Sequence, residues 1–249
     1  DLRTPIVAGN WKCNKTVDEA LQLAHEVLHS TEEARCEVVL FPPFTALESV
    51  AAVVDDAGLG YGAQDLFYED EGAYTGAVSG KMIAEIGSQY VIVGHSERRK
   101  FFGETNDLIV KKVLAAYRND LDPILCVGED ADEHEKGSTK DKILSQLLPV
   151  LQVLTDEQAK RLLVAYEPVW AIGTGKSAEV RDAVAAAELI RSEVAKKFGK
   201  DVARYTRILY GGSVTSENAH AFHEDGIDGV LVGGASLSAK DFSAIANTF

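Results

Sequence analysis

Three side chains of this sequence could do acid–base or anion-binding chemistry, and each lies at the end of an apolar run. Lys12 follows the first run, His95 follows the fourth, and Glu167 closes the sixth. A carboxylate or an imidazole can transfer protons, and an ammonium can stabilise a developing oxyanion. Each residue alone also has a structural interpretation: a solvated charge for Lys12, a hydrogen-bonded histidine for His95, and a capping or ion-paired carboxylate for Glu167. Their common position after apolar runs favours a shared site.

Glycine pairs follow the last two apolar runs. Gly211 and Gly212 precede Ser213, and Gly233 precedes Gly234. Such pairs are most often simple turns. Because glycine has no Cβ, however, its backbone can approach a ligand closely, and backbone N–H groups can then hold a phosphate dianion. The pattern predicts an anion site beside the three side chains.

The apolar runs themselves are the elements that must position these residues. They lack clean period-2 alternation, as expected for strands that are covered on both faces. The runs are Ile6–Asn10, Val38–Phe41, Leu59–Gln64, Tyr90–Val93, Pro123–Val127, Leu162–Glu167, Arg207–Tyr210 and Gly229–Val232.

Helical patterns fill the gaps between the runs. A long helix is expected over Lys176–Phe198, ending at Gly199. Three other helices should begin with a capping box, in which a threonine is followed three residues later by Glu or Gln. These are Thr16 with Glu19, Thr45 with Glu48, and Thr155 with Gln158.

Repeated strand–helix units without a linker predict one domain over residues 1–249. The fold class is α/β, and we expect a single (β/α)₈ barrel, with a parallel eight-stranded barrel inside and helices outside. An open doubly wound sheet remains the alternative. In a barrel the active site forms at the carboxyl ends of the strands, which would bring the acid, the imidazole, the cation and the glycine turns to one mouth.

The composition limits the kinds of molecule that this protein is expected to bind. The chain carries 25 Lys+Arg against 39 Asp+Glu, a net charge of −14, which argues against nucleic acid or an anionic membrane as partner. An anionic substrate would therefore need a locally positive pocket, supplied by Lys12 and helix N-termini. No segment has the pattern of a secretory signal or a membrane span. The three cysteines, Cys13, Cys36 and Cys126, show neither pairing nor zinc spacing, which indicates a reducing, cytoplasmic location and no metal.

Longer segments around these residues resemble the triosephosphate isomerase family. The resemblance runs from the first apolar run to the last, in the same order and spacing. The matching segments are Asn10–Lys12, Val93–Arg99, Ala165–Lys176, Tyr210–Val214 and Leu231–Leu237.

The resemblance implies an aldose–ketose isomerase of glycolysis and gluconeogenesis that interconverts dihydroxyacetone phosphate and D-glyceraldehyde 3-phosphate through an enediolate. Glu167 would be the base, neutral His95 would polarise the carbonyl and shuttle a proton, and Lys12 would offset negative charge. A carboxylate suits this step because its two oxygens can serve adjacent carbons. No metal or organic cofactor is expected. Further implied residues are Asn10 for substrate orientation, Glu97 and Cys126 as supporting residues, and Gly173, Ser213, Gly233 and Gly234 for the phosphate.

The segment from Pro168 to Lys176 resembles the lid of this family. A plain loop is the alternative, but the apolar run at its centre is poorly suited to permanent exposure in water. Closure would exclude water and protect the enediolate. The lid residues are Pro168, Trp170, Ile172, Gly173, Thr174, Gly175 and Lys176.

The resemblance also implies a homodimer in which Thr75, on the loop after the third run, reaches the partner's site. Ala77 occupies a position where the family generally carries a Glu that pairs with the arginine across the interface. Arg98 is therefore expected to lack this interface partner and the dimer to be weakened. Asp65 stands where Asn is frequent. Expected interface residues are Cys13, Gln64, Tyr74, Thr75, Gly76, Ala77 and Arg98. The thiol of Cys13 is either reactive or a small buried apolar group.

Two other functions remain open on the sequence. A barrel isomerase of larger sugar phosphates would share the glycine turns, but it would not share the segments around Lys12, His95 and Glu167 together. A catalytically silent barrel kept for binding another protein is disfavoured by the same three intact residues.

Overall fold

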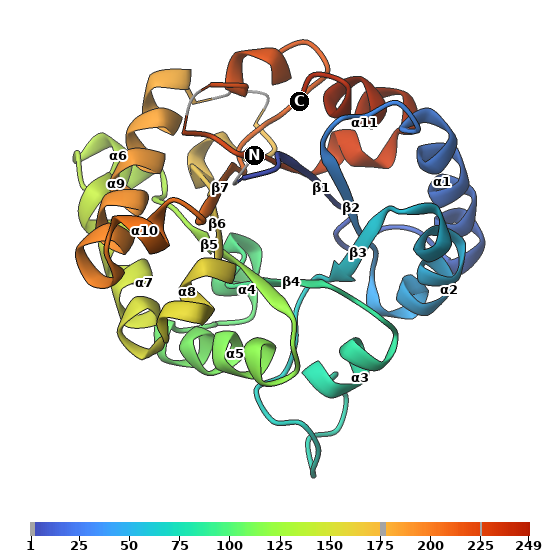
Figure 1. Cartoon of the computed structure of the whole chain (residues 1–249), viewed down its shortest axis with the longest axis horizontal. Coiled ribbons are helices and arrows are strands. Elements are labelled where there is room, and N and C mark those ends of the chain that lie inside the picture. Colours follow the sequence, from blue (N-terminus) through green and yellow to red (C-terminus); the bar gives the residue numbers. More distant parts are fainter. Residues whose placement is uncertain (1–2, 175–177, 225) are drawn as a thin grey trace.

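The apolar runs form a closed barrel of eight parallel strands, arranged in the order of the sequence (Figure 1). The computed structural model describes residues 3–174, 178–224 and 226–249. Strand β1 (Ile6–Asn10) pairs with β2 (Glu37–Phe41) on one side and with β8 (Gly229–Val232) on the other. This closure confirms the expected barrel and excludes the open sheet.

The strand bounds agree closely with the apolar runs, although two runs extend past the strand end. Gln64 and Glu167 each follow the last residue of their strand, because the chain turns there toward the mouth of the barrel. The remaining strands are β3 (Gly60–Ala63), β4 (Tyr90–Val93), β5 (Asp122–Val127), β6 (Leu163–Tyr166) and β7 (Arg207–Tyr210).

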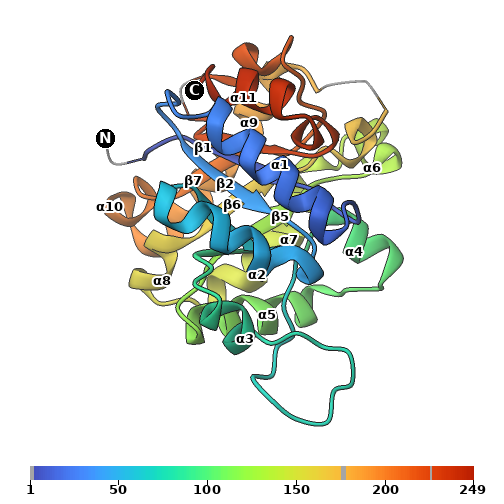
Figure 2. The same cartoon turned by 90° about the vertical axis from the view of Figure 1, so that its right-hand side faces the viewer.

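Helices cover the outside of the barrel (Figures 1 and 2). The α-helices are α1 (Val17–Ser30), α2 (Phe44–Val54), α3 (Gly80–Glu85), α4 (Ser96–Phe101), α5 (Asn106–Arg118), α6 (Ala131–Glu135), α7 (Thr139–Val153), α8 (Asp156–Arg161), α9 (Val180–Phe198), α10 (Lys200–Ala203) and α11 (Ala239–Ala246). Short 3₁₀ helices are η1 (Asp55–Ala57), η2 (Val169–Ala171), η3 (Ala219–Phe222) and η4 (Gly234–Leu237). Within the part of the chain that the structure describes, none of these helices has the length and apolarity to cross a membrane.

Local capping signals were right at two of the three predicted helix starts. Thr16 and Thr155 each form a capping box, which confirms those predictions. The prediction at Thr45 is wrong. Helix α2 begins at Phe44, two residues earlier than a cap at Thr45 would place it, after Pro43 in an extended conformation, so Thr45 already lies in the first turn.

The long helix α9, in contrast, begins later than predicted. It starts at Val180, because Glu179 has an extended backbone with ψ of 146°. The predicted start at Lys176 lies outside the described residues. The predicted end is confirmed, since the helix stops at Phe198 and Gly199 takes φ of 88°, a conformation that glycine adopts without strain.

Alternate residues of the strands face two different apolar layers. Ile6 and Ala8 belong to the cluster that fills the barrel, whereas Val7 packs in the larger cluster between the strands and the helices. Because both faces of every strand are buried among apolar side chains, the sequence shows continuous apolar runs rather than alternation. The packed interior fixes the strand ends, and with them the polar residues at the mouth.

Candidate active site

Lys12 is held above the end of β1 by three neighbouring side chains. Its backbone N–H donates to Oδ1 of the buried Asn10 over 3.0 Å, and its carbonyl oxygen accepts from Nε2 of Gln64 over 2.9 Å. Its ammonium Nζ lies 2.7 Å from Oε1 of Glu97. Lys12 also takes φ of 54°, a left-handed conformation that is unusual for a residue with a Cβ. The position of Lys12 is therefore fixed by its strained backbone and by the polar side chains of Asn10, Gln64 and Glu97.

His95 is the N-cap of α4 and lies at the carboxyl end of β4. Its Nδ1 accepts a hydrogen bond from the backbone N–H of Glu97 over 3.2 Å. An Nδ1 that accepts cannot carry a proton, so the ring hydrogen sits on Nε2 and the ring is neutral in this arrangement. Nε2 lies 3.1 Å from Oε2 of Glu167. This nitrogen is thus the one that can donate to a substrate oxygen.

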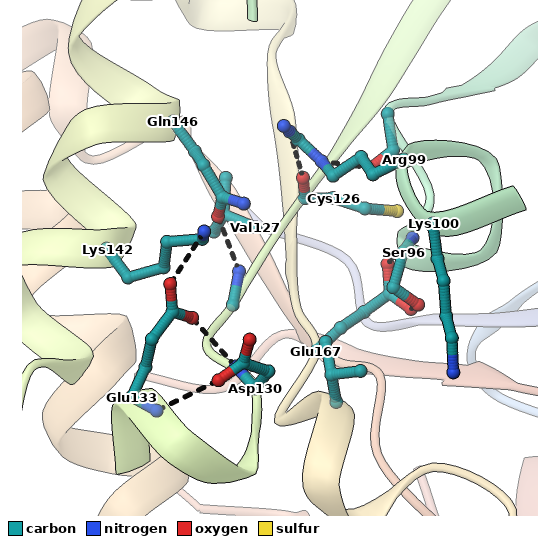
Figure 3. A pocket seen from close by; sticks show the side chains of 13 residues that line it. Ser96, Arg99, Lys100, Cys126, Val127, Asp130, Glu133, Lys142, Gln146 and Glu167 are labelled. Carbon is teal, nitrogen blue, oxygen red and sulfur yellow. Dashed lines mark hydrogen bonds and ion pairs between the residues drawn. The ribbon is translucent and has the colours of Figure 1, made fainter. Parts of the chain in front are cut away.

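Glu167 is buried beside His95, with 1% of its surface exposed. Its Oε2 accepts from the hydroxyl of Ser96 over 3.0 Å, and its Oε1 accepts from the backbone N–H of Ser96 over 3.3 Å. Figure 3 shows the carboxylate turned toward Ser96, along a cavity of about 470 Å³ that Cys126 also lines. Burial, with the charge of Glu167, raises the pKa of the Cys126 thiol well above its usual range, so Cys126 is an uncharged neighbour of the carboxylate.

Two glycines make room for Glu167. A Cβ on Gly128 would overlap the carbonyl oxygen of Glu167, and a Cβ on Gly211 would lie 3.0 Å from its Cγ. Sequence reasoning gave no role to Gly128 or to Ser96. Only glycine fits at position 128 because the end of β5 packs directly against the end of β6, where Glu167 lies. Ser96 stood in a matched segment, but its donors point at Glu167 only once the barrel is closed.

A second cavity, of about 250 Å³, is lined by His95 and by the glycine turns, and is called the glycine cavity below. Lys12 is the only cationic side chain among its described lining residues. A Cβ on Gly233 would approach Cε of Lys12 to 3.3 Å, so glycine there keeps the cation close to the backbone N–H groups. The helix η4 begins at Gly234 on its rim. The other predicted phosphate residues that line it are Gly173 and Ser213.

The predicted lid lies over these cavities as far as it is described. Pro168 precedes the one-turn helix η2, and Ile172 lines the glycine cavity. Trp170 donates from Nε1 to Oε1 of Glu129 over 3.0 Å. Thr174 donates to the carbonyl oxygen of Trp170 over 3.4 Å. The predicted lid residues Gly175 and Lys176 lie outside the described residues.

The loop between β3 and α3 extends away from the barrel, as Figure 2 shows. It carries the predicted interface residues Tyr74, Thr75, Gly76 and Ala77, of which Tyr74 is 43% exposed. Cys13 is exposed, so its alternative as a buried apolar group is wrong for the single chain. Gln64 instead turns inward to the backbone of Lys12.

Arg98 has two carboxylate partners within its own chain. Its Nε lies 2.7 Å from Oε1 of Glu104 and 3.1 Å from Oδ2 of Asp65, both in the same chain. Lys112 contacts the same two carboxylates. Helix α5 brings Lys112, and the turn before it brings Glu104, to a position that sequence spacing did not indicate. Arg98 is therefore compensated within its own chain, and the effect of Ala77 on a dimer stays a prediction.

The fold and the site together define a class of protein. A neutral imidazole donor, a buried carboxylate and one ammonium beside a glycine-lined anion cavity, at the carboxyl mouth of a closed barrel, are the parts of an enzyme that moves protons on a phosphorylated substrate.

Comparisons with known proteins narrow this class. The family model described as triosephosphate isomerase matches residues 5–249. A protein of Moorella thermoacetica named triosephosphate isomerase is 50% identical over 99% of this chain and 99% of its own length. Another of that name, from Caldanaerobacter subterraneus subsp. tengcongensis, is 48% identical over 99% of this chain and 100% of its own. A third, from Clostridium tetani, is 47% identical over 99% of this chain and 97% of its own. The chain belongs to the triosephosphate isomerase family.

Proposed function

We propose that Glu167 is the base with which this chain interconverts dihydroxyacetone phosphate and D-glyceraldehyde 3-phosphate, the aldose–ketose isomerisation of its family. The observation that carries this assignment is the meeting of Glu167 and His95 over 3.1 Å, because His95 lines the cavity that also holds Lys12 and the glycine turns. A proton acceptor, a neutral donor and a fixed cation are the groups that a proton transfer through an enediolate requires. The reaction belongs to glycolysis and gluconeogenesis.

The base must move before it can act. The carboxylate of Glu167 lines the cavity of about 470 Å³ shown in Figure 3. Glu167 is not among the described residues that line the glycine cavity. A rotation of its side chain would exchange the two Ser96 hydrogen bonds for a position beside the reacting carbons. One oxygen would take the proton from the carbon next to the carbonyl, and the protonated carboxyl would return it to the neighbouring carbon.

The other polar groups act on the substrate oxygens. The Nε2–H of His95 donates to the carbonyl oxygen, and the ring shuttles a proton between the two oxygens of the enediolate. The ammonium of Lys12 offsets the charge of the enediolate and the phosphate. Asn10 orients the substrate from the end of β1, and Glu97 fixes the position of Lys12 through their ion pair. Cys126 supports Glu167 as an uncharged packing partner.

The phosphate would occupy the glycine cavity. Gly233, Gly234, Ser213 and Gly173 offer backbone N–H groups or a hydroxyl there, so an acidic protein can bind an anion through fixed dipoles and one cation. The lid that begins at Pro168 would close over this cavity when the phosphate binds. Closure would keep water from the enediolate and prevent the loss of phosphate.

The assignment is tested by incubating the folded protein with glyceraldehyde 3-phosphate in D₂O and following the products by proton NMR. We expect dihydroxyacetone phosphate, with solvent deuterium on the carbon that receives the proton. A five-carbon sugar phosphate serves as the competing substrate. Turnover of that compound alone would transfer the assignment to another sugar-phosphate isomerase, and the absence of any turnover would contradict an isomerase altogether.

We also propose a homodimer in a reducing, cytoplasmic compartment. The projecting loop of Tyr74 and the large exposed apolar side chains of Phe101 and Phe102 offer a surface for a second copy of the chain. All three cysteines are free, as a reducing compartment requires. Sedimentation from nanomolar to micromolar protein tests the dimer. A single species of monomer mass across this range would contradict it.

A further inference from the structure

Trp170 of the lid is anchored to a buried carboxylate outside the substrate cavity. Oε1 of Glu129 accepts from the indole Nε1 of Trp170 over 3.0 Å and from the hydroxyl of Tyr166 over 2.9 Å. The side chain of Glu129 is 1% exposed, and its backbone carbonyl accepts the N–H of Val169 over 2.9 Å. The first turn of the lid is thus bound to Glu129 by both its backbone and a side chain.

His134, on α6, covers this anchor from the solvent side. Its ring stacks on the indole of Trp170 with the ring centroids 4.3 Å apart and the planes inclined by 26°. Its Nδ1 lies 3.4 Å from Oε1 of Glu129, the same oxygen that accepts from Trp170. The side chain of His134 is 42% exposed, so its ring can exchange protons with the solvent. One imidazole therefore contacts both the anchor and the anchored ring.

The other charged groups that face His134 and Glu129 come from several elements. Lys140 at the start of α7 and Asp182 on α9 line the same hollow beside the cluster, and Glu133 and Glu135 flank His134 on α6. Tyr166 comes from β6. Burial, with the charge of Glu129, raises the pKa of the Tyr166 hydroxyl well above its usual range, so Tyr166 remains a donor. A histidine, in contrast, changes charge between about pH 5 and 8.

Protonation of His134 would strengthen both of its contacts. An imidazolium 3.4 Å from a buried carboxylate gains attraction that solvent screens only in part. A cation over the face of an indole is attracted by the ring as well. Both effects favour the present position of Trp170 over any position that requires Trp170 to leave Glu129.

We propose that His134 is a pH-sensitive latch on the lid: its protonated ring holds Trp170 against Glu129 and so opposes closure. This proposal rests on the lid closure of the proposed function, in which Trp170 leaves its anchor while Ile172, two residues further on, covers the substrate. His134 is a positioning residue, since it touches Trp170 and Glu129 and acts on the reaction only through them. Below the pH at which His134 becomes charged, the open lid gains stability and turnover slows.

The contact is tested first without substrate, by intrinsic fluorescence. The chain has two tryptophans, Trp11 and Trp170, and Trp11 is fully buried away from solvent. Because a protonated imidazole stacked on an indole quenches its emission, the wild type should lose emission as the pH falls from 8 to 5. The H134Q variant should show no such transition. The H29Q variant is the matched control, since His29 also lies beside a carboxylate, Glu32, at 3.3 Å but is 88% exposed.

The pH profile of turnover gives the second readout. Relative to H134Q, the wild type should lose roughly two- to fivefold in kcat on the acid side, the size of one cation–ring contact. H134R, with a permanent charge, should keep the slower rate at every pH. H29Q should follow the wild type.

The outcomes separate the latch from the proposed function. A transition that persists in H134Q, or identical pH profiles of kcat in wild type and H134Q, would overturn the latch. An absence of turnover in the folded wild type would instead overturn the proposed function, and the fluorescence titration would still decide whether protonated His134 holds Trp170.

Discussion

Ser96 holds the carboxylate of Glu167 with two donors, its hydroxyl at 3.0 Å and its backbone N–H at 3.3 Å. Ser96 and Glu167 both line the cavity of Figure 3, and neither is among the described residues that line the glycine cavity. In the proposed mechanism this is the resting position of the base, so turnover should depend on the length of the Glu167 side chain as well as on its charge.

Two substitutions of Glu167 separate the requirement for charge from the requirement for length. E167Q removes the base and should lower kcat by roughly 10³–10⁴-fold. E167D keeps the charge but withdraws the carboxylate by about one methylene, which should lower kcat about 10²-fold with little change in KM. Steady-state kinetics on both substrates provides the measurement, with E48Q, an exposed carboxylate on α2, as the control. An E167Q variant with more than a tenth of the wild-type kcat would rule out Glu167 as the base.

Lys12 should contribute to substrate binding and to the rate together. K12M removes the only cation among the described residues of the glycine cavity, so KM should rise and kcat/KM fall by roughly 10²–10³-fold. K12R keeps the charge on a differently shaped group and should fall between K12M and the wild type. K240M, which removes an exposed lysine on α11, is the control. Equal kinetics of K12M and wild type would contradict the role.

The charge cluster of Arg98 and Lys112 should depend unequally on its two carboxylates. Burial opposes ionisation of Glu104, but hydrogen bonds from Lys112 and Arg98 outweigh it and lower the pKa of Glu104. Burial raises the pKa of Asp65 despite the same two cations. A carboxyl group whose pKa is lowered in the folded protein contributes stability that is complete above the ordinary carboxyl range and is lost as the pH falls through the lowered value. A carboxyl group whose pKa is raised in the folded protein instead destabilises the folded state above the raised value.

We therefore expect E104Q to reduce the free energy of unfolding at neutral pH by about 3–5 kcal/mol, as for a broken buried ion pair. D65N should cost about 1 kcal/mol or less there, because the folded state already disfavours that charge. Urea unfolding at pH 7 and at about pH 3 measures both, and the deficit of E104Q should shrink at the lower pH. E71Q, an exposed carboxylate, is the control. A larger loss in D65N than in E104Q would refute this ranking.

The three thiols should react with an alkylating reagent in a fixed order. Cys13 is exposed and should react first. Burial raises the pKa of Cys36 to about 11, and burial also raises that of Cys126 well above its usual range, so both should react far more slowly at pH 8. Mass spectrometry after timed iodoacetamide treatment gives the rates. If Cys13 lies in a dimer interface, its rate should rise on dilution; early labelling of Cys126 would contradict the described burial.

The barrel could be predicted from the sequence because its rules are local and repeated. Each strand is buried on both faces, so it appears as an apolar run, and each run ends where a polar residue meets the mouth. Asn10, His95 and Glu167 were found in this way. The Thr45 prediction was wrong because a threonine–glutamate spacing cannot show that the chain after Pro43 is already helical at Phe44.

Contacts between distant elements could not be predicted. Nothing in the spacing of Arg98 and Asp65 shows that they meet, because the contact depends on how α4 and the end of β3 pack. The rotation of Glu167 toward Ser96 is a choice between side-chain conformers that sequence does not encode. The stacking of His134 on Trp170 likewise requires the turn after β5 to lie against the turn after β6.

The left-handed backbone of Lys12 sets stability against activity at a single position. A residue with a Cβ at φ of 54° destabilises the fold by about 1–2 kcal/mol relative to a relaxed conformation, and glycine would remove that penalty. K12G should thus be more stable than the wild type, and it should lose the part of the turnover to which Lys12 contributes. A screen of this chain for heat resistance alone would select that loss, so any thermostabilised library must be assayed for turnover in the same round.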